Sequence, residues 1–157
     1  MCSVKRRVLV LYGGRSAEHE VSCRSAAFVL KNLDPAKYLV HAIGIDKSGR
    51  WLPQDTPTLL AALATTKAVP IEVPRGSMPT LPAAHDPGSS LVTLAGSRED
   101  LVVFPVLHGT FGEDGTMQGL LELTEVAYVG PDTMGSAAGM DKVVAKKLVQ
   151  SAGIPVV

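Results

Sequence analysis

Leu101-Val102-Val103-Phe104-Pro105-Val106-Leu107 runs directly into His108-Gly109-Thr110-Phe111-Gly112-Glu113-Asp114-Gly115. The first segment is apolar throughout, which is typical of a parallel strand covered on both faces. The second segment holds three glycines, and the apolar residues behind it predict a helix over 116–124 with Asp114 as its N-cap. A histidine in such a turn, ahead of a helix N-terminus, suits an anion such as a carboxylate or phosphate. A plain strand-to-helix connection, with the histidine satisfied by backbone groups, explains the same stretch equally well.

The beginning of the chain predicts a second strand-to-helix turn of the same kind. Val8-Leu9-Val10-Leu11-Tyr12 is a short apolar run that ends at Gly13-Gly14. We expect a helix to begin between residues 16 and 22 and to stop at Asp34-Pro35, ahead of a strand over 39–45. Strand, helix and strand at this spacing predict a right-handed βαβ unit.

The remaining segments predict the other strands and helices of an α/β fold. Trp51 and Leu52 are expected to cover a sheet edge, residues 59–63 to form a short helix, and residues 66–90, which are rich in proline, to form an extended surface excursion. Further predictions are strands over 91–94 and 126–129, helices over 133–140 and after a capping Asp141, and the opening of a strand over 153–157. The fold class is therefore α/β: a small, doubly wound, mostly parallel sheet flanked by helices.

Composition limits the classes of function. The 157 residues are about one domain in length and carry 15 basic and 15 acidic side chains, so no excess charge favours nucleic acid or an anionic membrane. No apolar run approaches the roughly 20 residues that span a bilayer. Two cysteines are too few for a disulfide framework and fit a reducing, cytoplasmic compartment.

The two glycine-rich loops are expected to meet. In a doubly wound sheet, ligands bind at the carboxyl ends of the strands where the strand order reverses. If the segment 101–124 lies on the other side of the first strand, the loop over 13–22 faces the loop over 108–115. Acidic and imidazole groups and two helix N-termini would then surround one crevice, which suits an amino acid substrate. For Glu20, Glu113 and Asp114, a structural role at a helix end is the more frequent alternative.

Other kinds of site have weaker support. The first turn lacks the Gly-x-Gly-x-x-Gly pattern of a dinucleotide site, although Asp46 follows the second strand as a ribose-binding acid does. His19 and Cys23 stand four residues apart, but no third metal ligand is evident, so no metal site is predicted. The chain contains neither a Gly-x-Ser-x-Gly elbow nor a phosphate loop ending in Gly-Lys-Ser/Thr.

Three motifs in order resemble the D-alanine-D-alanine ligase family: residues 13–22, residues 108–115 with Gln118-Gly119, and residues 136–142. The resemblance implies an ATP-grasp ligase that joins two D-alanines for peptidoglycan through an acyl phosphate, with ATP and Mg²⁺, as a cytoplasmic homodimer. It implies that Glu18 holds the ammonium of the first D-alanine and that His108 hydrogen-bonds near the carboxylate that is phosphorylated. It also implies that the remaining site residues shape the substrate pocket or reach ATP phosphates: Val21, Ser22 and Gly109 for the pocket, and Lys142 for ATP.

The resemblance also implies a division of the chain. Residues 1–130 correspond to the N-terminal pre-ATP-grasp domain and residues 131–157 to the first, truncated helices of the central domain, while 53–100 match no motif. Because members of this family are about twice as long, we expect the 157-residue chain alone not to ligate. Two alternatives stay open: a D-alanine-D-lactate ligase, and a stand-alone amino acid-binding module. A nucleotide-dependent oxidoreductase is a third and weaker one.

Overall fold

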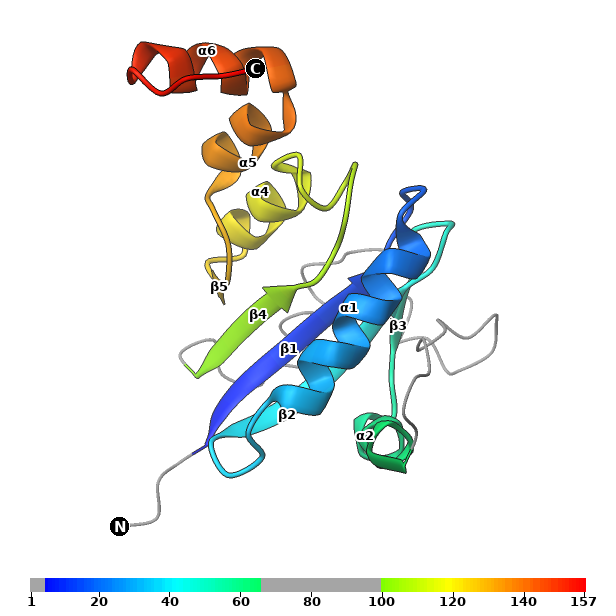
Figure 1. Ribbon diagram of the computed structural model, residues 1–157. Helices are drawn as coiled ribbons and strands as arrows, with labels where there is room; N and C mark the ends of the chain where they lie inside the picture. The colour runs from blue at the N-terminus through cyan, green and yellow to red at the C-terminus, as the bar shows by residue number, and fades with distance from the viewer. Residues whose placement is uncertain (1–4, 66–99) are drawn as a thin grey trace.

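The computed structural model describes residues 5–65 and 100–157, which form a five-stranded sheet with helices on both faces (Figure 1). The strand order is β3-β2-β1-β4-β5. The strands β2, β1, β4 and β5 are parallel, and β3 is antiparallel to β2. The strand bounds are Arg6–Gly13 for β1, Tyr38–Ile45 for β2, Trp51–Pro53 for β3, Leu101–Pro105 for β4 and Ala127–Tyr128 for β5. The predicted doubly wound, mostly parallel sheet is confirmed. The strand order reverses at β1, which has β2 on one side and β4 on the other.

The strand β1 is central because both of its faces are buried. Val8, Val10 and Tyr12 point to one face, and Leu9 and Leu11 to the other, as the two-residue period of a strand requires. All five are buried. The continuous apolar run therefore serves two cores at once, which is the usual pattern of a covered parallel strand.

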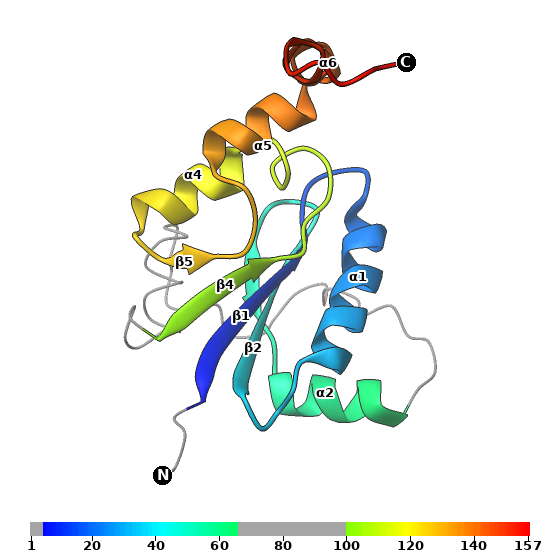
Figure 2. The ribbon, with the colours of Figure 1, turned by 60° about the vertical axis from the view of Figure 1, so that its left-hand side comes forward.

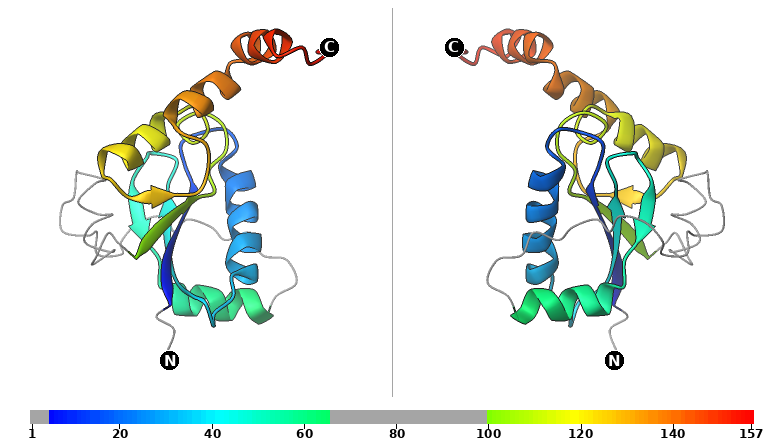
Figure 3. Two further views of the ribbon diagram at one scale, coloured as in Figure 1. Left: turned by 90° about the vertical axis from the view of Figure 1, so that its left-hand side faces the viewer. Right: turned by 90° about the vertical axis from the view of Figure 1, so that its right-hand side faces the viewer.

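Helices divide between the two faces of the sheet (Figures 2 and 3). The helix α1 (His19–Asn32) covers one face, and α2 (Thr56–Thr65) adds Leu63 to the same core. The helix α4 (Thr116–Leu123) covers the other face through Met117 and Leu121. Both α1 and α4 begin just beyond the carboxyl ends of neighbouring strands, so the two glycine-rich loops lie at the same edge of the sheet.

Several expected elements differ from the structure. Trp51 and Leu52 do more than cover an edge, since they form the antiparallel strand β3 on β2. Residues 154–157 form no strand, because no described strand lies beside them to pair with. The predicted excursion over 66–90 and the strand over 91–94 lie outside the described residues.

The last two helices extend away from the sheet. The helix α5 (Thr133–Met140) begins at Asp132, whose carboxylate accepts the Gly135 N–H, and α6 (Lys142–Ser151) begins at the predicted cap Asp141. No residue of α6 is buried. Within the described ranges, no helix is both long enough and apolar enough to cross a membrane.

Candidate amino acid-binding site

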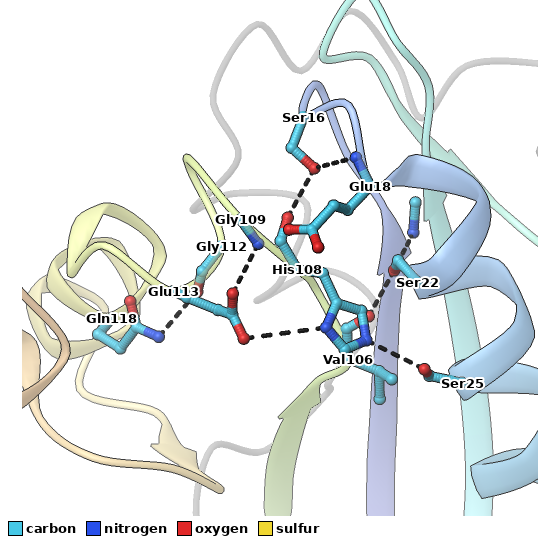
Figure 4. Close-up of polar contacts among 11 residues, drawn as sticks. Ser16, Glu18, Ser22, Ser25, Val106, His108, Gly109, Gly112, Glu113 and Gln118 are labelled. Carbon is cyan, nitrogen blue, oxygen red and sulfur yellow. Dashed lines mark hydrogen bonds and ion pairs between the residues drawn. The ribbon is translucent and has the colours of Figure 1, made fainter. Parts of the chain in front are cut away.

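The loops after β1 and β4 are joined by Ser16. Its Oγ donates a hydrogen bond to the carbonyl oxygen of His108 at 2.6 Å and accepts one from the N–H of Glu18 at 3.1 Å (Figure 4). Ser16 thus links two segments that are 92 residues apart in the sequence. The predicted meeting of the two loops is confirmed, and it places Glu18 beside the turn that follows His108.

The Glu18 carboxylate lies against Gly109. A Cβ added to Gly109 would stand 2.7 Å from Glu18 Oε2, and the backbone there has a φ of +71°, so only glycine fits without strain. Glu18 occupies the N-cap position of α1 but makes no side-chain capping bond. Within residues 5–65 and 100–157 no hydrogen bond or ion pair uses its carboxylate, so an exposed negative charge stands open at the crevice.

Ser22 holds the backbone beneath this crevice in place. Its hydroxyl accepts the N–H of Gly13 at 2.8 Å and donates to the carbonyl of Val106, which ties the carboxyl end of β1 to the segment after β4. The residue is fully buried. It shapes the site through these two backbone groups and has no hydroxyl free for a ligand, whereas Val21, one residue earlier, is exposed.

The imidazole of His108 stands between a hydroxyl and a carboxylate (Figure 4). Its Nε2 lies 3.0 Å from Ser25 Oγ of α1, and its Nδ1 lies 3.8 Å from Glu113 Oε1. The second carboxylate oxygen of Glu113, Oε2, accepts the N–H of Gly109 at 2.7 Å. The ring is therefore oriented by one group from α1 and one from the loop after β4.

The turn over 109–115 is shaped by its own polar groups. The two oxygens of Asp114 accept the N–H groups of Phe111 and Thr116 at 2.8 and 3.1 Å, and Gln118 donates to the Gly112 carbonyl at 2.9 Å. The predicted N-cap was placed one residue early, because Gly115, in the left-handed conformation that glycine favours, is the cap of α4. Burial raises the pKa of Asp114, but the bonds from Phe111 and Thr116 outweigh this and hold the pKa below its ordinary value.

A cavity of about 420 Å³ adjoins the crevice on the α4 side of the loops. Arg15, at its rim, stands over the Phe111 ring with 5.0 Å between the guanidinium carbon and the ring centroid. His108 lines the cavity, but Glu18 and Ser22 do not. The apolar part of the lining comes from both sheet and helix: Ile45, Trp51, Leu107, Met117 and Leu120. The Glu18 carboxylate and the cavity are thus neighbouring features with different chemistry.

Other candidate residues have partners of their own. The Asp46 carboxylate accepts bonds from Ser48 and Arg50 inside its own turn; burial raises its pKa, but these bonds outweigh burial and lower it to about 2. A ribose-binding role for Asp46 is thereby disfavoured. Glu20 lies in the first turn of α1, as its helix-end interpretation predicted, and it also pairs with Lys47 at 2.5 Å on the surface.

The metal interpretation of His19 and Cys23 gains no third ligand. His19 Nδ1 lies 2.7 Å from the carbonyl oxygen of Gly14. No group of three or more His, Cys, Asp or Glu side chains that could hold a metal gathers in the part of the chain that the structure describes. Lys142 is exposed at the start of α6, on the arm that extends beyond α5 (Figure 1), and it is not brought to the Glu18 and His108 crevice.

A family model described as the D-Ala D-Ala ligase N-terminus matches residues 7–131. The chain belongs to that family. A D-alanine–D-alanine ligase of Mycolicibacterium smegmatis is 45% identical over 157 residues, covering 97% of this chain and 42% of the relative. A D-alanine–D-alanine ligase of a Bradyrhizobium strain is 50% identical over 154 residues, covering 96% of this chain and 41% of the relative. The chain therefore spans about two fifths of the length of these relatives.

Solved structures place the same fold in the same family of ligases. The D-alanine–D-alanine ligase of Coxiella burnetii superposes with a TM-score of 0.71 at 35% identity, over 98% of this chain and 43% of that one. The VanG D-Ala:D-Ser ligase of Enterococcus faecalis superposes with a TM-score of 0.67 at 34% identity, over 98% and 43%. The family thus includes ligases whose named second substrates differ.

Three polar residues near the crevice were not predicted as site residues. Ser16 joins the two loops, Ser25 contacts the His108 ring, and Glu113, interpreted as structural, also faces that ring. A signal for Ser25 existed, since Glu18, Ser22 and Ser25 recur at positions i, i+4 and i+7 and so share one face of α1. No comparable pattern indicated the contact of Glu113 with His108.

Proposed function

We propose that this chain is the first-substrate-binding part of an ATP-dependent D-alanine–D-alanine ligase, which makes D-alanyl-D-alanine for peptidoglycan. The family membership and the names of the curated relatives support the reaction. One structural observation carries the assignment to this crevice. The Glu18 carboxylate has no partner among residues 5–65 and 100–157 and lies beside the His108 turn, with the two loops held together by Ser16.

Different residues of the crevice bind different parts of one amino acid. The Glu18 carboxylate pairs with the substrate ammonium, a charge-assisted contact that fixes orientation. The His108 ring donates a hydrogen bond near the substrate carboxylate. Once that group is an acyl phosphate, such a donor stabilises the negative charge that develops on its carbonyl oxygen when the second amine attacks. Val21, Ser22 and Gly109 shape the walls: Gly109 admits the Glu18 side chain, and Ser22 holds β1 and β4 in register.

ATP supplies the phosphoryl group that activates the first carboxylate, with Mg²⁺ as its counterion. Among the residues of this chain, only Lys142 is proposed to reach the ATP phosphates, since it is exposed at the first position of α6. The described residues offer no cluster of three metal-ligating side chains. We therefore assign the magnesium ligands to the portion of the ligase that corresponds to the rest of the relatives' length.

We further propose that residues 1–130 form the N-terminal domain and residues 131–157 the first helices of the central domain. Exposed α6, with Val143 and Leu148 turned to solvent, supports this division because such a face is completed by packing. We also propose that the ligase is a cytoplasmic homodimer. Phe28 on α1 is exposed and is a suitable contact between the two subunits.

D-Alanine is proposed as the second substrate. The curated relatives that are 45% and 50% identical to this chain are named D-alanine–D-alanine ligases, which supports this choice. The D-alanyl-D-lactate alternative is separated from it by supplying D-alanine with D-serine or D-lactate as the acceptor and identifying the product by mass.

The test joins this chain, at the matching position, to the remaining part of the Mycolicibacterium smegmatis relative and measures ADP release with D-alanine. Glu18→Gln removes one charge-assisted contact and is expected to lower kcat/KM by about one to two decades, or about 1.5 to 3 kcal/mol. Glu20→Gln is the matched control, since it removes only an exposed surface pair. Equal kinetics of the two variants would contradict the assignment of Glu18.

Calorimetry on the 157-residue chain addresses the stand-alone binding module. D-Alanine binding that disappears in Glu18→Gln and survives in Glu20→Gln would favour a crevice that works without the rest of a ligase. Loss of binding in both variants would mean that the effect is not specific to the Glu18 carboxylate.

A further inference from the structure

The His108 ring has a different kind of partner on each nitrogen. The Glu113 carboxylate, facing Nδ1 at 3.8 Å, can only accept hydrogen bonds, whereas the Ser25 hydroxyl, 3.0 Å from Nε2, can donate or accept. A neutral imidazole carries its proton on one nitrogen only. The proton on Nδ1 satisfies both partners, because Ser25 then donates to Nε2. The proton on Nε2 would instead leave the Nδ1 lone pair facing a carboxylate oxygen, which is electrostatically unfavourable.

Glu113 cannot easily turn away from the ring. Its other oxygen, Oε2, accepts the Gly109 N–H at 2.7 Å, and Gly109 is the residue that follows His108. The carboxylate is thus anchored to the same turn whose histidine it faces. Ser25 is anchored differently, on the second turn of α1, one helical turn after the buried Ser22. The Glu18 carboxylate is a second acidic group near this turn, and it contacts Gly109.

We propose that Glu113 and Ser25 are positioning residues that hold His108 with its proton on Nδ1 and its Nε2 turned to the Ser25 hydroxyl. The 3.8 Å between His108 Nδ1 and Glu113 Oε1 is longer than a hydrogen bond, so Glu113 orients the Nδ1–H without forming a hydrogen bond to it. One consequence of this inference rests on the proposed function: if His108 donates to a substrate carboxylate, the donor is Nδ1–H. The tautomer itself is a property of the 157-residue chain.

The test is nitrogen NMR of the ¹⁵N-labelled chain at a pH where its imidazoles are neutral. Long-range proton–nitrogen correlations distinguish the protonated from the unprotonated ring nitrogen, and His108→Gln identifies the signals by their loss. His19 is an internal reference, because its Nδ1 lies 2.7 Å from the Gly14 carbonyl oxygen, an acceptor that requires Nδ1–H. The expected result is the same Nδ1–H pattern for His108.

Glu113→Gln then isolates the carboxylate. A glutamine oxygen can keep the Gly109 N–H bond while its amide group presents a donor to the ring, so most of the His108 population is expected to move to the Nε2–H form. Ser25→Ala is expected to shift only the Nε2 resonance, through loss of the hydroxyl. The matched control Glu18→Gln is expected to leave the tautomer unchanged.

The inference is overturned by an Nε2–H pattern for His108 in the unaltered chain, or by an unchanged tautomer in folded Glu113→Gln. The first is decisive even if a variant fails to fold. A tautomer controlled by Glu18 in place of Glu113 would also overturn it. The proposed function is tested separately. If it is wrong, Glu18→Gln has no effect on ligation, while the His108 nitrogen signals are as expected.

Discussion

The two loops of the crevice look alike in sequence but are held in place by different means. The first loop, residues 13–18, is fixed by Ser16 and Ser22, whose hydroxyls bond to backbone carbonyls 92 and 84 residues away. The second loop, residues 108–115, is fixed by Glu113 and Asp114, whose carboxylates bond to N–H groups within four residues. The first loop is therefore a product of the assembled sheet, and the second is largely a product of its own sequence.

This difference explains which carboxylate is available to a ligand. The acidic groups of the second loop are used to fold the loop, so Glu113 and Asp114 have backbone partners. Because serines hold the first loop, its carboxylate Glu18 is left without a partner among residues 5–65 and 100–157. The open carboxylate thus lies in the loop that is held in place by hydroxyl groups.

The largest effect is expected from Ser22→Ala. It leaves the Gly13 N–H and the Val106 carbonyl buried without a partner, at a cost of about 2 to 4 kcal/mol in the free energy of unfolding. Urea unfolding of the 157-residue chain measures it. Ser151→Ala, which removes an exposed hydroxyl bonded only within α6, is the control and should change stability by less than about 0.5 kcal/mol. Similar values for both variants would mean that the first loop is not held by its contact with β4.

A smaller effect is expected from Asp114→Asn. One of two acceptor oxygens is lost, so either the Phe111 or the Thr116 N–H loses a charge-assisted partner, at about 1 to 2 kcal/mol. Phe111 has a φ of +65°, which is unfavourable for a phenylalanine and depends on this bond. Asp100→Asn, an exposed change outside the loop, serves as the control in the same urea experiment. No difference between the two would show that the second loop does not depend on its own carboxylates.

Ser16→Ala is expected to destabilise the chain by only about 0.5 to 1.5 kcal/mol, because this hydroxyl is partly exposed and water can replace it. Its effect on the crevice should be larger than its effect on stability. In the joined ligase, loss of the tie between the loops should raise the KM for D-alanine more than it lowers kcat. An unchanged KM would show that Ser16 does not position Glu18.

The smallest effect is expected in the acid range. Hydrogen bonds hold the folded-state pKa of Asp114 below its ordinary value of 3.8, so its contribution to stability is present above pH 3.8 and is lost as the pH falls through the lowered value. The stability difference between the unaltered chain and Asp114→Asn should therefore shrink below pH 3.8. A difference that stays constant down to pH 2 would contradict this linkage.

Local patterns in the sequence were sufficient to predict most of the strands and helices in order, and the two glycine-rich loops, although the strand β3 was not predicted. These depend on short-range patterns: apolar runs with a period of two or 3.6, glycines at turns, and side chains within a few residues of the backbone they cap. Asp141 was predicted as a cap for this reason, and the structure confirms it.

The tertiary structure was needed to establish how the first loop is held, which nitrogen of His108 faces which partner, and that Ser25 contacts the ring. The contacts of Ser16, Ser22 and Ser25 with the segment after β4 join residues 83 to 92 positions apart, and they exist because β1 and β4 pair in parallel with a particular register. A register is fixed by the packing of both faces of the sheet, a property of the assembled core that no local pattern contains. The sequence favoured a structural role for Glu113 and, through the family resemblance, a binding role for Glu18. The assembled loops add that Glu113 is hydrogen-bonded and that Glu18 has no partner among residues 5–65 and 100–157.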